Sequence, residues 1–233
     1  MHQILTDGLA ELQIPFSDAK YDQFCTYYEM LTEKNAVMNL TAIKGKQDTA
    51  RLHFLDCAAL LGVYDFAGKS VIDIGTGAGF PGIPLKILQP GMALTLLDSH
   101  GKRMAFVKDV CQKLNFADTS CICARAEEVC GDIGGSFDIA VSRAVARLNI
   151  LCELCLPFVH VGGVFIAMKG PDCAEELSEA AHAIKILGGG EPELKTYRIP
   201  GTDIAHSAVI VPKLAKTPEL YPRSFGRIKK APL

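Results

Sequence analysis

The chain has 233 residues, a formal net charge of −2, 49% apolar residues and 21% charged residues. This composition is ordinary for a folded globular protein and excludes a disordered chain. No apolar run approaches the roughly 18 uninterrupted residues that span a membrane, and the N-terminus lacks the basic start and apolar block of a signal peptide. Nine cysteines in a chain without an export signal predict reduced thiols and a cytoplasmic protein.

Four of these cysteines form two short patterns. Cys152 and Cys155 make a C-x-x-C motif, but no second pair and no histidine pair accompany it. We expect them inside a helix, with metal or redox use as the alternative, and we predict no metal site. Cys121 and Cys123 alternate in an expected strand and are predicted to face the core.

Positive charge is concentrated at the C-terminus. Residues 213–233 hold six basic residues against Glu219 alone, which leaves a charge of −7 for residues 1–212. The six are Lys213, Lys216, Arg223, Arg227, Lys229 and Lys230. A basic end on an acidic body favours a local contact with a polyanion, and a merely solvated tail is the alternative.

The first 65 residues are predicted to be helical. Ser17 and Asp18 can cap a helix. Its apolar face would be formed by Tyr21, Phe24, Cys25, Tyr28 and Leu31. Thr49 can cap another helix that carries Leu52, Leu55 and Ala59 on one face. Glycines near residue 66 then mark a change of architecture, so we expect a helical extension over 1–66 and a main domain over 67–233.

Strand-like apolar runs alternate with helical stretches after this point. The expected strands are 70–75, 93–98, 120–124, 137–142 and 163–169, with a late strand over 206–214 that can pair with 195–200 as a hairpin. The expected helices between them are 84–88, 102–114 and 146–159. Near-continuous apolar strands joined by helices predict a Rossmann-like α/β fold with a mostly parallel sheet of about seven strands and helices on both faces.

The segment DIGTGAGFPGIP, residues 73–84, joins the first of these strands to the helix after it. A loop at this place lies at the carboxyl edge of the sheet, where ligands of such folds bind. No Lys-Ser or Lys-Thr closes the loop, which excludes a phosphate-binding P-loop. The helix is expected to begin near Pro81 or Pro84, because proline suits a first helical turn.

Two cofactor classes remain for this loop. Gly77, Gly79 and Gly82 match the Gly-x-Gly-x-x-Gly of dinucleotide-binding proteins. Asp73 with Gly75, Gly77 and Gly79 instead resembles the first motif of S-adenosylmethionine-dependent methyltransferases. Such a methyl donor carries an ammonium group, which Asp73 can help to hold directly or through water, and glycine lets the backbone approach the ligand closely.

Two later strand ends add to the site. Asp98 can accept both hydroxyls of a ribose, which either cofactor class contains. Ala126 and Glu127 follow the third strand, where methyltransferases commonly bind adenine. A solvated first helical turn is the alternative for Glu127.

Seven segments together resemble one family. They are MNLTAI (38–43), RLHFLDC (51–57), VIDIGTGAGFPGIPLKI (71–87), LLDSHGKR (96–103), SRAVARL (142–148), GGVFIAMKG (162–170) and YPRSFGRIKKAPL (221–233). They resemble the bacterial ribosomal RNA small-subunit methyltransferase G family, also called glucose-inhibited division protein B. The resemblance implies a class I methyltransferase fold, S-adenosylmethionine as cofactor, and methylation of guanine N7 in 16S ribosomal RNA.

The resemblance also implies roles for individual residues. Contacts with the methyl donor are expected from Gly75, Phe80, Ala126 and Glu127. Arg143 is expected as the catalytic residue, at the junction of cofactor and target base. Contacts with RNA are expected from His53, Lys169, Arg223, Arg227, Lys229 and Lys230. Asp56 matches a motif position without an assigned role. Two positions depart from the family pattern: Cys57 replaces a usual serine, and Ser224-Phe225 interrupt a tail usually richer in Arg and Pro.

The expected chemistry needs no general base, because guanine N7 has an available lone pair at neutral pH. We therefore assign Arg143 to positioning a phosphate or the cofactor carboxylate, not to proton transfer. The partner would be 16S RNA or the small ribosomal subunit, the protein is expected to be a monomer, and the target base should be unpaired or unstacked. The alternatives are a nicotinamide-dependent reductase, a methyltransferase of another RNA, and a non-catalytic ribosome assembly factor.

Overall fold

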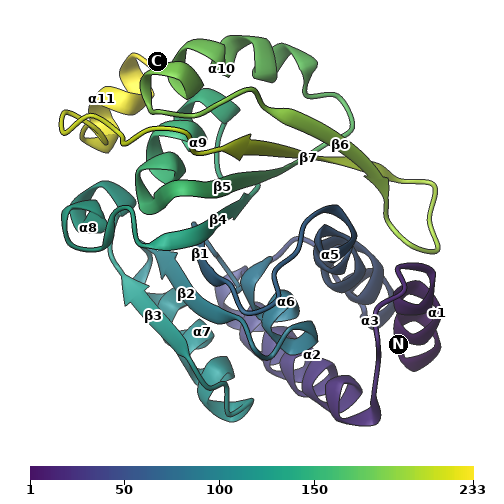
Figure 1. Ribbon diagram of the computed structural model, residues 1–233. Coiled ribbons are helices and arrows are strands. Elements are labelled where there is room, and N and C mark those ends of the chain that lie inside the picture. The colour runs from purple at the N-terminus through teal and green to yellow at the C-terminus, as the bar shows by residue number, and fades with distance from the viewer.

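A computed structural model describes residues 1–233 as helices around one seven-stranded sheet of order β3-β2-β1-β4-β5-β7-β6 (Figure 1). The strands are β1 (Ser70–Ile74), β2 (Ala93–Asp98), β3 (Thr119–Cys123), β4 (Phe137–Arg143), β5 (Val159–Lys169), β6 (Glu193–Arg198) and β7 (Ala205–Pro212). The first five run parallel, while β7 is antiparallel to β5 and pairs with β6 as the expected hairpin. The predicted Rossmann-like fold is confirmed.

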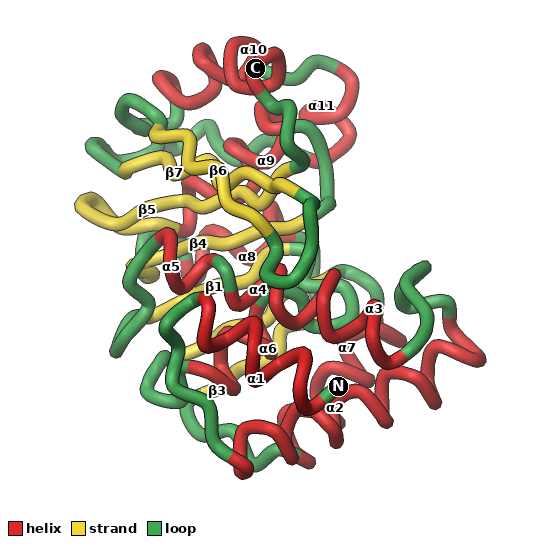
Figure 2. The backbone as a smooth tube through the Cα atoms, turned by 90° about the vertical axis from the view of Figure 1, so that its right-hand side faces the viewer, coloured by secondary structure: helices red, strands yellow, loops and turns green.

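Helices cover both faces of this sheet. They are α1 (His2–Glu11), α2 (Asp18–Met38), α3 (Lys46–Thr49), the π-helix η1 (Ala50–Leu55), α4 (Asp56–Ala58), α5 (Leu60–Val63), α6 (Gly82–Leu88), α7 (Gly101–Lys113), α8 (Ala126–Ile133), α9 (Leu148–Cys155), the 3-10 helix η2 (Leu156–Phe158), α10 (Ala174–Ile186) and α11 (Phe225–Lys230). Figure 2 shows α10 and α11 at one end of the molecule and α1 and α2 at the other. None of these helices is long and apolar enough to cross a membrane.

Alternate residues of each central strand enter two separate apolar clusters. In β1, Val71 belongs to the cluster that includes residues of α1, α2, η1, α6 and α7, whereas Ile72 and Ile74 belong to the cluster that includes residues of α8, α9, α10 and α11. Successive strand side chains point to opposite faces, so a strand buried on both sides needs apolar residues throughout. This explains why these strands have near-continuous apolar sequences. Cys152 and Cys155 are buried in α9 as predicted, but Cys123 is exposed at the end of edge strand β3.

The helix α2 is capped as expected, and it supports the glycine loop. The Ser17 hydroxyl accepts a hydrogen bond from the Lys20 amide at 3.4 Å. Tyr27, outside the predicted apolar face, is fully buried beside Phe24 and Leu31. Its hydroxyl donates to the Ala78 carbonyl at 2.7 Å, so α2 is tied to the loop that follows β1.

The prediction that Thr49 begins a helix is wrong. The helix α3 begins after Gly45, and Thr49 is its last residue before the chain continues into η1. Gly45 has φ of +88°, a backbone conformation that favours glycine and that the spacing of apolar residues does not reveal. The division at residue 66 stays a prediction, since Phe54 of η1 and Leu9 of α1 share one apolar cluster with the sheet.

Candidate active site

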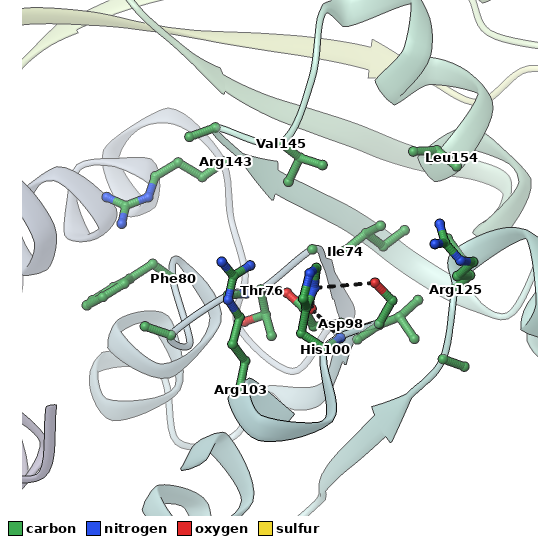
Figure 3. Close-up of a pocket in the computed structure, with 18 of the residues that line it drawn as sticks. Ile74, Thr76, Phe80, Asp98, His100, Arg103, Arg125, Arg143, Val145 and Leu154 are labelled. Atoms are coloured by element: carbon green, nitrogen blue, oxygen red, sulfur yellow. Dashed lines mark hydrogen bonds and ion pairs between the residues drawn. The ribbon is translucent and has the colours of Figure 1, made fainter. Parts of the chain in front are cut away.

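A cavity of about 530 Å³ lies at the carboxyl edge of the sheet (Figure 3). Its walls come from the strand ends and loops at 74–78, 97–100, 124–127 and 143–145. These segments follow β1, β2, β3 and β4. From β1 the chain adds β2 and β3 on one side, and it then returns to add β4 and β5 on the other side of β1. The carboxyl ends of β1 and β4 are therefore the topological switch point, where α/β sheets bind ligands. Gly75, Gly77, Phe80, Asp98 and Arg143 all line the cavity, as separate sequence motifs predicted, whereas Gly79 of the same glycine set does not.

Two glycines of the loop have separate structural roles. Gly75 has φ of +72°, and a Cβ there would come within 2.5 Å of Val145 across the cavity wall. Gly82 packs α6 against the sheet, since a Cβ would lie 2.6 Å from Leu96 and 2.9 Å from Asp73. Gly82, the third glycine of the apparent dinucleotide motif, is therefore explained by the close packing of α6 on the sheet.

Asp73 supports the loop from behind and does not line the cavity. It is fully buried, and one carboxylate oxygen, Oδ2, accepts hydrogen bonds from the Thr76 hydroxyl at 2.7 Å and the Gly82 amide at 2.8 Å. The other oxygen, Oδ1, has no partner. Burial raises the pKa of Asp73 to about 6 despite these hydrogen bonds. Asp73 thus stabilises the loop and does not reach the cavity for a direct contact with an ammonium group. A water-mediated contact through Oδ1 stays a prediction.

Asp98 lies in the middle of the cavity wall (Figure 3). Its Oδ2 accepts the Gly77 amide at 3.0 Å, and its Oδ1 accepts the His100 amide at 2.8 Å. The His100 imidazole Nδ1 lies 2.9 Å from the same Oδ1. These contacts orient the carboxylate, and Oδ2 keeps a second lone pair with which to accept a hydroxyl.

Arg143 is held at the opposite end of the cavity from Arg125 and Leu154 (Figure 3). Its Nη1 lies 3.1 Å from Asp56 Oδ2, and its Nη2 lies 2.9 Å from His53 Nδ1. The guanidinium also lies 4.8 Å from the centre of the Phe80 ring, which in turn stacks on the His53 ring at 4.2 Å. Three of the predicted site residues therefore form one cluster with Asp56.

His53 lines the cavity but offers no positive charge to RNA. It is only 6% exposed, and burial, reinforced by Arg143, lowers its pKa to about 3. A guanidinium can only donate, so Nδ1 accepts from Arg143 and the imidazole proton is on Nε2. That nitrogen lies 2.7 Å from the Thr41 hydroxyl. His53 is therefore a neutral residue of the cavity wall, and the RNA contact expected for it stays a prediction.

Two predicted RNA-binding cations are used in internal ion pairs. Lys169 lies 2.7 Å from Glu176 and donates to the Ala146 carbonyl at 2.8 Å. Arg223 donates to both carboxylate oxygens of the fully buried Glu153, at 2.8 and 2.6 Å. These ion pairs connect parts of the fold, and the contacts with RNA expected from Lys169 and Arg223 stay predictions. The ion pairs could not be predicted, because neither Glu176, seven positions from Lys169, nor the buried Glu153, 70 positions from Arg223, stands in a distinctive sequence pattern.

The remaining cations predicted to bind RNA are exposed to solvent, unlike Lys169 and Arg223. Arg227, Lys229 and Lys230 are exposed on α11, whose Ile228 is fully buried. Lys213, counted in the basic end, is buried and donates to the Leu187 carbonyl at 2.6 Å. The surface charge of the C-terminus is thus concentrated on one short helix.

Several residues of the site were missed. The Asp56 carboxylate also accepts from Tyr197 Oη at 3.1 Å and from His206 Nδ1 at 2.8 Å, so it joins the N-terminal helices to β6 and β7. Phe225 reaches the cavity from the C-terminus. The motif containing Asp56 was the one available signal; neither Tyr197 nor Phe225 stands in a pattern that predicts a site.

Comparisons with known proteins agree with this geometry. The family model "rRNA small subunit methyltransferase G" matches residues 20–200. The chain is 44% identical to the ribosomal RNA small subunit methyltransferase G of Alkaliphilus oremlandii (strain OhILAs), over 100% of this chain and 99% of the relative. It is 45% identical to the protein of the same name from Alkaliphilus metalliredigens (strain QYMF), over 99% and 98%.

Solved structures show the same fold at low sequence identity. The O-methyltransferase from Bacillus cereus in complex with SAH has a TM-score of 0.57 and 16% identity, covering 87% of this chain and 94% of that one. The predicted class I methyltransferase fold is confirmed by this likeness. Sequence similarity over the full length, however, is what decides the family: the chain belongs to the rRNA small subunit methyltransferase G family.

Proposed function

We propose that the protein transfers a methyl group from S-adenosylmethionine to N7 of a guanine in the 16S RNA of the small ribosomal subunit. The observation that carries this proposal is one cavity that unites the glycine loop, Asp98 and Arg143, in a chain of this family. Guanine N7 follows from the family resemblance of the sequence motifs. Such a substrate implies work in the bacterial cytoplasm, and we infer that the protein acts as a monomer.

The residues of the cavity fit this methyl donor. Asp98 Oδ2 is an oriented acceptor of the kind that a ribose hydroxyl needs, and Gly75 permits close approach of a ligand to the backbone. Ala126 and Glu127 would hold the adenine, and Phe80 would line the end nearest Arg143. When bound, the cofactor supplies an electrophilic methyl group on its sulfonium sulfur.

The cluster around Arg143 suits a reaction without proton transfer. Both imidazole nitrogens of His53 are occupied, and its low pKa keeps it neutral, so it is not a general base. A guanidinium has five N–H donors, and contacts with Asp56 and His53 use two of them. The others can position a carboxylate or a phosphate. Alignment of the reacting groups is the contribution that this displacement requires from the protein.

RNA would be held by the exposed cations Arg227, Lys229 and Lys230 of α11. Phosphate contacts of this kind give affinity without base specificity and depend strongly on salt. N7 lies in the deep and narrow major groove of A-form RNA, which side chains cannot enter. The target guanine is therefore presented unpaired or out of its stack.

Nucleoside mass spectrometry of 16S RNA tests this proposal in the cell. A strain without the gene should lack one 7-methylguanosine, and the parent gene should restore it. Restoration should fail with Arg143→Ala, expressed at the same level and folded as judged by its melting temperature. Persistence of the modified nucleoside in the deletion strain would refute the proposed activity, and it would favour a role in ribosome assembly.

A further inference from the structure

The C-terminal segment returns to the cavity at the end opposite Arg143. Phe225, the first residue of α11, lines the cavity together with Ala126, Glu127 and Leu154. The Phe225 backbone amide donates a hydrogen bond to Glu127 Oε1 at 3.1 Å. The Arg125 guanidinium lies 5.4 Å from the centre of the Phe225 ring. An aromatic ring from residue 225 is therefore part of a site built from the ends of β1 to β4.

Anchors on both sides of Phe225 fix it there. Two residues before it, Arg223 pairs with Glu153, which is fully buried in α9, and the Arg223 backbone amide donates to the same carboxylate at 2.9 Å. Three residues after it, Ile228 is fully buried in the apolar cluster of α8, α9 and α10. Figure 1 shows α11 beside α9. The ring is thus preorganised and needs little further ordering to meet a ligand.

Phe225 lies in the C-terminal segment that resembles the family, but it was not among the residues expected to contact the cofactor. Ser224-Phe225 is where the tail departs from the usual pattern of basic residues and proline. A half-buried phenylalanine that faces a polar-edged cavity presents a flat apolar surface, which is the shape that a purine ring stacks on. Glu127, held by the Phe225 amide, keeps acceptor capacity for an exocyclic amino group on that purine.

We propose that Phe225 is a cofactor-positioning residue that forms the aromatic wall of the adenine subsite. The C-terminal segment thereby belongs to the methyl-donor site in addition to carrying the exposed cations of α11. Removal of the ring leaves the fold intact and opens the adenine end of the cavity to water. The inference rests on the proposed use of S-adenosylmethionine, but it does not depend on which RNA is methylated.

Tryptophan fluorescence tests the placement directly, because the chain contains no tryptophan. Phe225→Trp introduces a single reporter, and titration with S-adenosylhomocysteine should change its emission in a saturable manner. Phe116→Trp is the matched control: Phe116 is also half-buried, but it packs against the other apolar cluster and lines no part of the cavity. Its emission should not respond to the ligand. A response of neither reporter, in protein that binds the ligand by calorimetry, would overturn the inference.

Affinity measurements test the contribution of the ring. Phe225→Ala should weaken the binding of S-adenosylhomocysteine about tenfold, within the range seen when a base loses its aromatic partner. Phe225→Tyr should restore it, and Phe116→Ala should bind like the parent. Equal affinities of parent and Phe225→Ala would overturn the inference, as would equal weakening by Phe116→Ala. If the parent itself fails to bind the ligand, the proposed function fails instead.

Discussion

The Arg143 guanidinium forms an ion pair with Asp56 at 3.1 Å, although 87 positions separate the two residues in the sequence. Asp56 is almost fully buried, at 2% exposure, and also accepts hydrogen bonds from Tyr197 and His206. One carboxylate therefore joins the N-terminal helices to β4, β6 and β7. The same carboxylate also fixes the position of the Arg143 guanidinium in the cavity.

Asp56→Asn should disturb the site through Arg143. The variant keeps the shape of the side chain but removes the charge that compensates the guanidinium, and the loss of one partner of a buried pair costs about 3 kcal/mol. We expect that decrease in the free energy of unfolding, measured in urea, and a fall in kcat larger than any rise in KM. Tyr197→Phe removes another hydrogen bond from the same carboxylate and should cost about 1 kcal/mol. Unchanged kcat in a folded Asp56→Asn protein would exclude the positioning role.

The exposed cations of α11 should contribute to the affinity for RNA but not to the affinity for the cofactor. Combined replacement of Arg227, Lys229 and Lys230 by alanine should weaken RNA binding and lower the slope of log affinity against log salt by about 2. The affinity for S-adenosylhomocysteine should stay the same, because these side chains point to solvent. Lys108 and Lys113 are exposed on α7 and give a control with two charges removed elsewhere. Equal losses from both sets of substitutions would mean that net charge, not α11, attracts RNA.

The pair Arg223–Glu153 should be a structural anchor. Arg223→Met leaves the Glu153 carboxylate buried without its cation, and we expect a loss of about 3 kcal/mol in the free energy of unfolding. Addition of Glu153→Leu removes the stranded charge and should recover most of that stability. Chemical denaturation of the two variants measures the difference. A double variant no more stable than the single one would argue against the pair as the cause.

Truncation after Pro212 removes Arg223, Phe225 and the exposed cations of α11 together, so it should impair both cofactor binding and RNA binding.

Asp73 should give the protein a distinctive pH dependence. Burial raises its folded pKa to about 6, from an ordinary value near 3.9. Between pH 4 and 6 the folded state binds more protons there than the unfolded state, so this carboxyl lowers stability as pH rises. Asp73→Asn lacks the effect. The free energy of unfolding of the variant, relative to the parent, should therefore rise by up to about 3 kcal/mol from pH 4 to pH 7. A constant or falling difference across urea titrations in that range would contradict this.

Much of the fold could be predicted because its signals are local. Apolar runs bounded by glycine, as in 70–75, mark strands that are buried on both faces, and the loop at 73–84 marks the ligand edge. Asp98 could be placed because it ends such a strand, whereas Arg143 was expected from the family resemblance of its motif. The partners of Lys169 and Arg223 could not be foreseen, since Glu176 and Glu153 are acids on helices with no pattern that distinguishes them from surface residues. Phe225 reaches the cavity only through long-range packing of the C-terminus.

Transfer of labelled methyl groups by the purified full chain tests the central claim most directly. The substrate would be small ribosomal subunits, or their 16S RNA, from a strain that lacks the gene, with labelled S-adenosylmethionine as donor. The account predicts label in a single 7-methylguanosine of the 16S RNA, and no transfer to RNA from the parent strain, where that site is already modified. Label in another nucleoside, or no transfer to either substrate by protein that binds the donor, would contradict it.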